Sequence, residues 1–165
     1  MKRPKARSTG LPTAAEGALH TLPLSAAQAA RAVLVDTGAL VALLDRQDRH
    51  HTAVTDWLAQ AHGVLLTVAP VLSEVAFFLP PRLCASLANL VTVGVLQLHA
   101  PSAQSHSRLA SLFDKYADRN PDWADVELIW LAEASGVSRI ATLDVADFSV
   151  YRIHGRKRFK LVLLG

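Results

Sequence analysis

The chain has 165 residues, which suits one domain with a buried core, and 51% of them are hydrophobic, which excludes a wholly disordered polypeptide. It carries 17 Lys and Arg against 14 Asp and Glu, a formal net charge of +3. A single cysteine, Cys84, excludes an internal disulfide framework and a cysteine-rich zinc site.

The charges are unevenly distributed along the chain. Residues 1–31 hold five basic side chains and one acidic one, and residues 152–165 hold five basic side chains and no acidic one. The stretch between them, residues 32–151, holds 7 basic and 13 acidic side chains. The acidic middle between two basic ends is not the pattern expected of a protein that binds nucleic acid through one uniformly basic face.

Residues 1–31 are rich in Pro, Ser, Thr, Gly and Ala and show no hydrophobic periodicity. We therefore expect a basic, disordered N-terminal extension over residues 1–31 and one folded domain over residues 32–165. The N-terminus has no apolar core of a signal peptide, and the longest uncharged stretch, Leu83–Ser107, contains several polar residues. We expect a cytoplasmic protein without a membrane-spanning segment.

The domain alternates aliphatic runs with helical patterns. The runs are typical of strands buried on both faces and cover residues 32–36, 64–68, 95–98, 139–143 and 160–164. The helical patterns cover residues 38–44, a segment after Asp48, and residues 69–78, 81–90, 102–116 and 122–134. Thr37 and Asp48 are expected to cap the first two helices, and Gly136 to end the last. This alternation predicts an α/β fold with a mostly parallel, five-stranded central sheet.

Several acids occupy positions that favour a functional site. Asp36 and Asp144 directly follow the first and fourth predicted strands, where open parallel sheets bind their ligands. Glu74 interrupts an otherwise apolar helix, in which an unpaired carboxylate is costly. Asp122 is expected to be a helix cap, whereas Asp125, three residues later, lies past the cap and needs another role. If the two strands are neighbours, their carboxylates meet at one edge of the sheet.

A carboxylate cluster without His or Cys suits a hard divalent cation such as Mg²⁺ or Mn²⁺. Such an ion can lower the pKa of a bound water and offset negative charge on a phosphodiester. Carboxylates alone would repel that substrate, so this chemistry requires the metal.

Four motifs, in this order, resemble those of PIN-domain ribonucleases, and above all the VapC toxins of bacterial VapBC toxin–antitoxin modules. They are VLVDTGALVALL at 33–44, VAPVLSEVAFF at 68–78, DWADVELIWLAE at 122–133 and IATLDVADFSVYR at 140–152. The resemblance spans about residues 32–164 and implies a PIN-like α/β/α sandwich. It also implies a Mg²⁺- or Mn²⁺-dependent endoribonuclease that hydrolyses RNA with metal-activated water, forms a homodimer and is silenced by a cognate VapB-like antitoxin.

By position, the resemblance makes four acids catalytic and metal-binding: Asp36, Glu74, Asp125 and Asp144. It gives accessory roles to Asp122, Asp147, Thr37 and Thr142, the two threonines matching hydroxyl positions that can hold a water or a ligand. A basic cluster follows the fourth motif and is a candidate contact for the RNA backbone: Arg152, Arg156, Lys157 and Arg158. The same residues would otherwise form a solvated hairpin turn around Gly155.

Two residues depart from the family pattern, and the sequence leaves the packing of several aromatic residues undecided. Glu127 and Trp130 are more polar or bulkier than the residues usual after the third acid, so the packing of their helix is open. Trp57 and Trp123 are expected in the core or in a dimer interface. Tyr151 is expected to pack rather than to stack on a base.

Three other functions compete with the nuclease hypothesis. A catalytically silent PIN-like module for RNA binding or scaffolding is the main alternative, and the presence of all four acids argues against it. A receiver-type phosphoryl-transfer domain needs an acceptor Asp after the middle strand, where His99 stands. A haloacid-type phosphatase needs Asp-x-Asp after the first strand, where the sequence reads Asp36-Thr37-Gly38.

Overall fold

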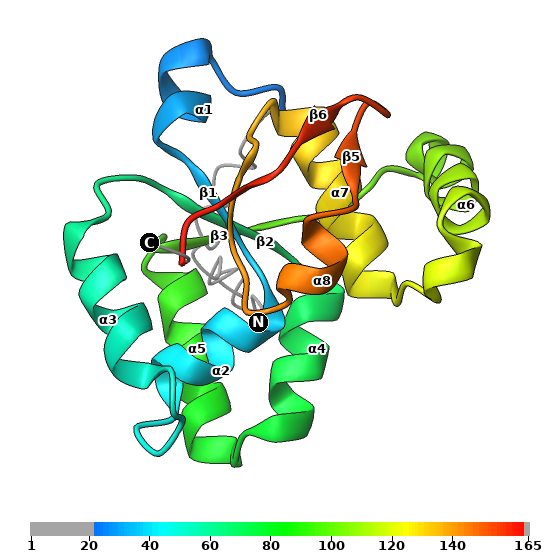
Figure 1. Cartoon of the computed structure of the whole chain (residues 1–165). Coiled ribbons are helices and arrows are strands. Elements are labelled where there is room, and N and C mark those ends of the chain that lie inside the picture. Colours follow the sequence, from blue (N-terminus) through cyan, green and yellow to red (C-terminus); the bar gives the residue numbers. More distant parts are fainter. Residues whose placement is uncertain (1–21, 164–165) are drawn as a thin grey trace, which may run out of the picture.

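The structure is a computed structural model and describes residues 22–163 (Figure 1). Its central sheet has five strands in the order β3-β2-β1-β4-β7, and each pairing is parallel. The strands are β1 (Val33–Val35), β2 (Leu65–Val68), β3 (Leu96–His99), β4 (Arg139–Ala141) and β7 (Lys160–Leu161). The predicted α/β fold with a mostly parallel five-stranded sheet is confirmed.

Burial on both faces explains why the central strands are continuous aliphatic runs. All residues of β1 and β2 are buried, and Leu34 and Leu66 are 0% exposed. Burying one such side chain contributes roughly 1.5–3 kcal/mol relative to leaving it in water. The end of β1, between β2 and β4, is therefore a firmly packed base for the residues that follow it.

Helices cover the sheet on two sides. Within residues 22–163 they are α1 (Ala26–Arg31), α2 (Thr37–Leu44), α3 (His51–Gln60), α4 (Ala69–Phe78), α5 (Pro81–Thr92), α6 (His106–Lys115), α7 (Trp123–Ser135) and α8 (Val145–Phe148). Two 3₁₀ turns, η1 (Ala103–Ser105) and η2 (Ala117–Arg119), flank α6. Helices α2 to α5 gather on one side of the strands, and α6 and α7 on the other (Figure 1). No helix in this part of the chain is long and apolar enough to cross a membrane.

Two helix caps differ from the sequence prediction. Asp36, not Thr37, is the N-cap of α2, because the Asp36 carboxylate accepts a hydrogen bond from the Thr37 N–H at 2.7 Å. Asp48 does not cap α3. Its carboxylate accepts a hydrogen bond from the N–H of His50 at 2.7 Å, and His50 itself precedes the helix as its cap.

Helix α7 is the most deeply buried helix of the described chain. Asp122 caps it and Gly136, at φ +78°, ends it in the left-handed region, as predicted. Glu127 and Trp130, whose packing the sequence left open, are both buried. A helix that is apolar on nearly all sides fits a position between the sheet and other elements.

Residues 22–31 of the expected extension include helix α1. Ser25 caps this helix by accepting a hydrogen bond from the Gln28 N–H at 3.3 Å, and Leu22 and Leu24 pack against the core. The remainder of the expected extension, residues 1–21, lies outside the described residues.

A short hairpin precedes β7. Strands β5 (Arg152–Ile153) and β6 (Lys157–Arg158) pair antiparallel. The turn between them passes through His154 and Gly155, at φ +49° and +72°, a region that glycine adopts without strain. The hairpin around Gly155 that the sequence allowed is therefore present.

Candidate active site

The parallel pairing of β1 with β4 fixes the position of the first acid. Val35 lies opposite Ala141, so the next residues, Asp36 and Thr142, are neighbours at the carboxyl end of the sheet. The Thr142 hydroxyl donates a hydrogen bond to Asp36 Oδ2 at 2.7 Å, while the Thr37 N–H donates to Oδ1. Asp36 is 8% exposed, and each of its carboxylate oxygens has a donor. The side chain is thus held in one orientation.

Burial raises the pKa of Asp36 to about 6. The hydrogen bonds from Thr142 and Thr37 oppose this rise, and repulsion from Glu74 and Asp122 adds to it. The charged form of a carboxyl that is buried close to other acids is costly unless a cation offsets its negative charge.

Glu74 lies on α4, which packs against α2. The Thr37 hydroxyl donates a hydrogen bond to Glu74 Oε2 at 2.7 Å. Burial raises the pKa of Glu74, and repulsion from Asp122 contributes to the rise. Thr37 therefore joins the first two acids, through its N–H to Asp36 and through its hydroxyl to Glu74.

Asp125 lies in the first turn of α7. Its N–H donates to the carboxylate of the cap Asp122 at 2.8 Å, whereas its own Oδ2 accepts a hydrogen bond from the Tyr151 hydroxyl at 3.0 Å. Burial raises the pKa of Asp125 to about 7, and repulsion from Asp122, Asp36 and Asp144 adds to the rise. The third acid therefore lies within electrostatic reach of the first.

Asp144 and Asp147 lie at the outer edge of this group. Asp144 is two residues beyond Thr142 and is exposed; it caps α8 by accepting a hydrogen bond from the Asp147 N–H at 3.0 Å. The Asp147 carboxylate lies 3.5 Å from the guanidinium of Arg119. The two strand-end acids, Asp36 and Asp144, thus differ sharply in solvent exposure.

We call the six carboxylates of this edge the acid site: Asp36, Glu74, Asp122, Asp125, Asp144 and Asp147. Within residues 22–163, no group of three or more His, Cys, Asp or Glu side chains is placed so that it could hold a metal ion. Mg²⁺ commonly binds through one or two carboxylates and keeps several waters, so it does not need three protein ligands. The acid site offers only oxygen donors. Its buried carboxyl, Asp36, and its half-buried carboxyl, Asp125, are both destabilised by acidic neighbours. This donor set fits a hard divalent cation.

The family model of the PIN domain matches residues 33–152. This chain belongs to the PIN-domain family. Ribonuclease VapC26 from Mycobacterium tuberculosis (strain ATCC 25618 / H37Rv) is 28% identical to it over 134 residues, which cover 79% of this chain and 99% of that protein. The crystal structure of Mycobacterium tuberculosis VapC20, a sarcin-ricin loop cleaving toxin, matches with a TM-score of 0.63 at 19% identity, over 69% of this chain and 91% of that one. The PIN-like α/β/α fold is confirmed.

The sequence did not predict that Tyr151 is the hydrogen-bond partner of Asp125 in this PIN domain. Tyr151 packs as predicted, with its ring 5.4 Å from that of Phe148 and 4.9 Å from that of Tyr116. Its hydroxyl also reaches Asp125, from which it is separated by 26 residues. No local spacing links the two positions, so only the tertiary fold reveals this hydrogen bond.

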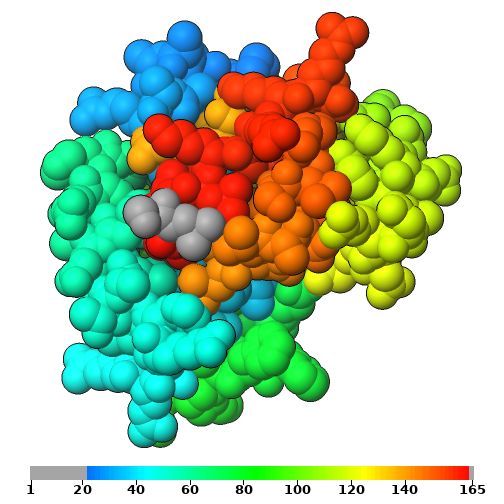
Figure 2. All heavy atoms as spheres, viewed as in Figure 1, coloured from blue at the N-terminus to red at the C-terminus, as the bar shows by residue number. Residues whose placement is uncertain are grey.

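The basic cluster lies apart from the acid site of the PIN domain. The β5–β6 hairpin lies at the same end of the molecule as α1, whereas α2 begins at the other end of β1 (Figure 1). The hairpin tip projects from the surface (Figure 2), and Arg156, Lys157 and Arg158 are exposed. Arg152 differs, because its guanidinium donates to three backbone carbonyls at 2.6–2.9 Å.

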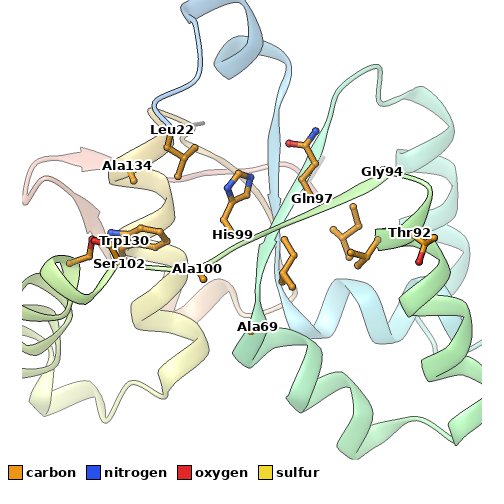
Figure 3. A pocket seen from close by; sticks show the side chains of 14 residues that line it. Leu22, Ala69, Thr92, Gly94, Gln97, His99, Ala100, Ser102, Trp130 and Ala134 are labelled. Carbon is orange, nitrogen blue, oxygen red and sulfur yellow. The ribbon is translucent and has the colours of Figure 1, made fainter. Parts of the chain in front are cut away.

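A groove of about 860 Å³ lies beside β3 (Figure 3). Its lining includes Gln97 and His99 of β3, Trp130 and Ala134 of α7, and Leu22. None of the six carboxylates of the acid site lines it. The groove and the acid site are therefore separate features of the PIN domain.

Proposed function

We propose that this chain is a Mg²⁺- or Mn²⁺-dependent endoribonuclease and acts as the toxin of a type II toxin–antitoxin pair. The observation that carries the proposal is the convergence of Asp36, Glu74 and Asp125, from three separate segments, at the carboxyl end of β1. The PIN-domain family and the name of the relative, a ribonuclease, support the choice of RNA as substrate.

Asp36 and Asp125 are the best direct ligands for the cation, with Glu74 and Asp144 as further ligands. The bound ion would supply a water of lowered pKa and a positive charge facing the phosphoryl oxygens. Asp36 and Asp125 carry the most strongly raised pKa values of the acid site, about 6 and about 7. Both values lie near neutral pH, so proton release from these acids would accompany metal binding.

Three hydroxyl groups prepare the carboxylates for this role. Thr142 orients Asp36, Thr37 orients Glu74, and Tyr151 orients Asp125, each through a hydrogen bond of 2.7–3.0 Å. Pre-orientation lowers the cost of reorganising ligands during the reaction. Mutating such supporting groups typically reduces metal affinity or activity 10- to 100-fold.

The partners follow from the same proposal. Arg156, Lys157 and Arg158 would contact backbone phosphates at some distance from the cut, whereas Arg152 mainly stabilises the hairpin. A VapB-like antitoxin would silence the enzyme, which would act in the cytoplasm as a homodimer.

The decisive test is RNA cleavage by the purified protein with Mg²⁺, with Mn²⁺ and with EDTA. We expect cleavage with either ion and none with EDTA, and Asp125→Asn should reduce the rate by at least about 100-fold if the carboxylate binds the ion. The matched control is Asp56→Asn, the same change at an exposed position of α3. If the wild-type chain binds RNA but does not cleave it with either ion, the catalytically silent module is correct and the nuclease proposal fails.

A further inference from the structure

A buried carboxylate on α7 lies outside the acid site. Glu127 is 6% exposed, and burial raises its pKa. Its Oε1 accepts a hydrogen bond from the Trp123 Nε1–H at 2.7 Å, from one helical turn earlier on the same face of the helix. Burying a carboxylate is costly, so this arrangement stabilises the Trp123 side chain at the expense of desolvating an acid.

Trp123 is fixed and yet half exposed. It is the first residue of α7, directly after the cap Asp122. The hydrogen bond to Glu127 holds one edge of the indole, and the ring of Phe113 supports it with centroids 5.1 Å apart and the planes tilted by 47°. Even so, 50% of Trp123 is exposed. A large aromatic surface held in this way is ready to bind a flat ligand without a further loss of rotamer freedom.

The charges around the acid site favour a nucleic-acid base, rather than a phosphate, as the ligand of Trp123. Phosphates near the site meet a carboxylate cluster, and the exposed basic residues of the β5–β6 hairpin lie at the opposite end of β1 (Figure 1). Apart from a bound cation and Arg119, which lies 3.5 Å from the Asp147 carboxylate, the described residues therefore add little positive charge to hold RNA close to the cut. Stacking of a base on an aromatic ring does not depend on this charge, and every base has a face that can stack.

We propose that Trp123 stacks on an unpaired base of a nucleotide that flanks the scissile phosphate, and that Glu127 positions Trp123 for this contact. This inference rests on the proposed nuclease function. Trp123 and Asp125 are two residues apart, so their side chains project to nearly opposite sides of the first turn of α7. The stacked base accordingly belongs to a nucleotide flanking the cut.

The test measures RNA binding in the Asp36→Asn background with Mg²⁺, so that cleavage does not interfere. The probes are a short fluorescent oligoribonucleotide of mixed sequence, its duplex, and a strand of equal length without bases. Trp123→Ala should weaken binding of the single strand by about 5- to 150-fold and leave binding of the other two probes unchanged. The single strand should also quench tryptophan fluorescence in the parent protein, and this quenching should be lost in Trp123→Phe.

Conservative variants separate stacking from folding. Trp123→Phe keeps a stacking ring but loses the N–H donor to Glu127, so its affinity for the single strand should lie between those of Trp123→Ala and the parent. Glu127→Gln keeps a hydrogen-bond acceptor and should bind as the parent does, whereas Glu127→Leu should weaken binding of the single strand alone. If Trp123→Ala does not fold, the fluorescence of the parent decides, and absence of quenching overturns the inference.

Unchanged binding of the single strand by Trp123→Ala overturns the inference, as does an equal loss for all three probes. A loss confined to a protein partner, with RNA binding intact, also overturns it. Cleavage by the wild-type chain is measured separately with Mg²⁺. If the wild-type chain cleaves RNA but Trp123 contributes nothing to binding, only the stacking inference fails. If binding depends on Trp123 but the wild-type chain does not cleave RNA, the proposed catalysis fails and the stacking contact stands.

Discussion

Replacing Asp36 by Asn should stabilise the metal-free protein while it abolishes cleavage. The pKa of Asp36 rises from 3.8 to about 6 on folding, a difference that corresponds to roughly 3 kcal/mol. Because the folded-state pKa lies above the unfolded one, folding favours the protonated carboxyl. The contribution of the protonated Asp36 carboxyl to stability is fully present below pH 3.8 and is lost as the pH rises through about 6. At pH 8 the carboxyl is charged and therefore weakens the fold. Asn removes this cost, but it forms a weaker hydrogen bond with the Thr142 hydroxyl. That loss reduces the gain in stability by about 1 kcal/mol.

We therefore expect the free energy of unfolding of Asp36→Asn to exceed that of the wild type by about 2 kcal/mol at pH 8, and to equal it or lie slightly below it at pH 4. The measurement is urea unfolding in EDTA at both pH values. Asp144→Asn is the matched control, because Asp144 is exposed and Asn caps a helix about as well as Asp. An Asp36→Asn variant that is less stable than the wild type at pH 8 would refute the reasoning. Added Mg²⁺ should stabilise the wild type and not this variant.

Three further changes test other contacts. Tyr151→Phe removes a hydrogen bond that favours the charged form of Asp125, so the pKa of Asp125 should rise further above about 7 in metal-free protein, as an NMR titration of the carboxyl carbons would reveal. Glu133→Gln disrupts the two bonds of 2.7 and 2.8 Å with Arg108 and should lower the free energy of unfolding by about 1.5–3 kcal/mol in a urea titration. Gly136→Ala places a Cβ at φ +78°, and thermal unfolding should show a loss of about 1–2 kcal/mol although no atom obstructs the side chain.

The fold was predictable because its elements are local patterns. Helix α4 has the predicted bounds, Ala69–Phe78, since Pro70 suits a first turn and Pro80 ends the pattern. The five aliphatic runs became five strands. Four are shorter than predicted, and β3, at Leu96–His99, is shifted by one residue from the predicted 95–98, because composition marks the presence of a strand better than its ends.

The candidate site was predictable only in part. The sequence identifies acids by their position after a strand or inside an apolar helix, as for Asp36 and Glu74. It does not identify partners distant in the chain, such as Tyr151 for Asp125 or Trp123 as the donor to a buried Glu127. Whether such side chains meet depends on how whole helices and loops pack, which no short spacing records.

The register of the sheet explains why the two strand-end acids are unequal. Val35 pairs with Ala141, so Asp36 meets Thr142, and Asp144 falls two residues further out. Asp36 therefore gains a buried hydroxyl partner and a raised pKa, while Asp144 stays in solvent and caps α8. In a strand, residues two apart point to the same face, so moving the acid from 144 to 142 would place two carboxylates directly side by side, at a repulsion that only a bound cation could offset. The hydroxyl at position 142 instead keeps one strand-end acid buried and oriented before any ion arrives.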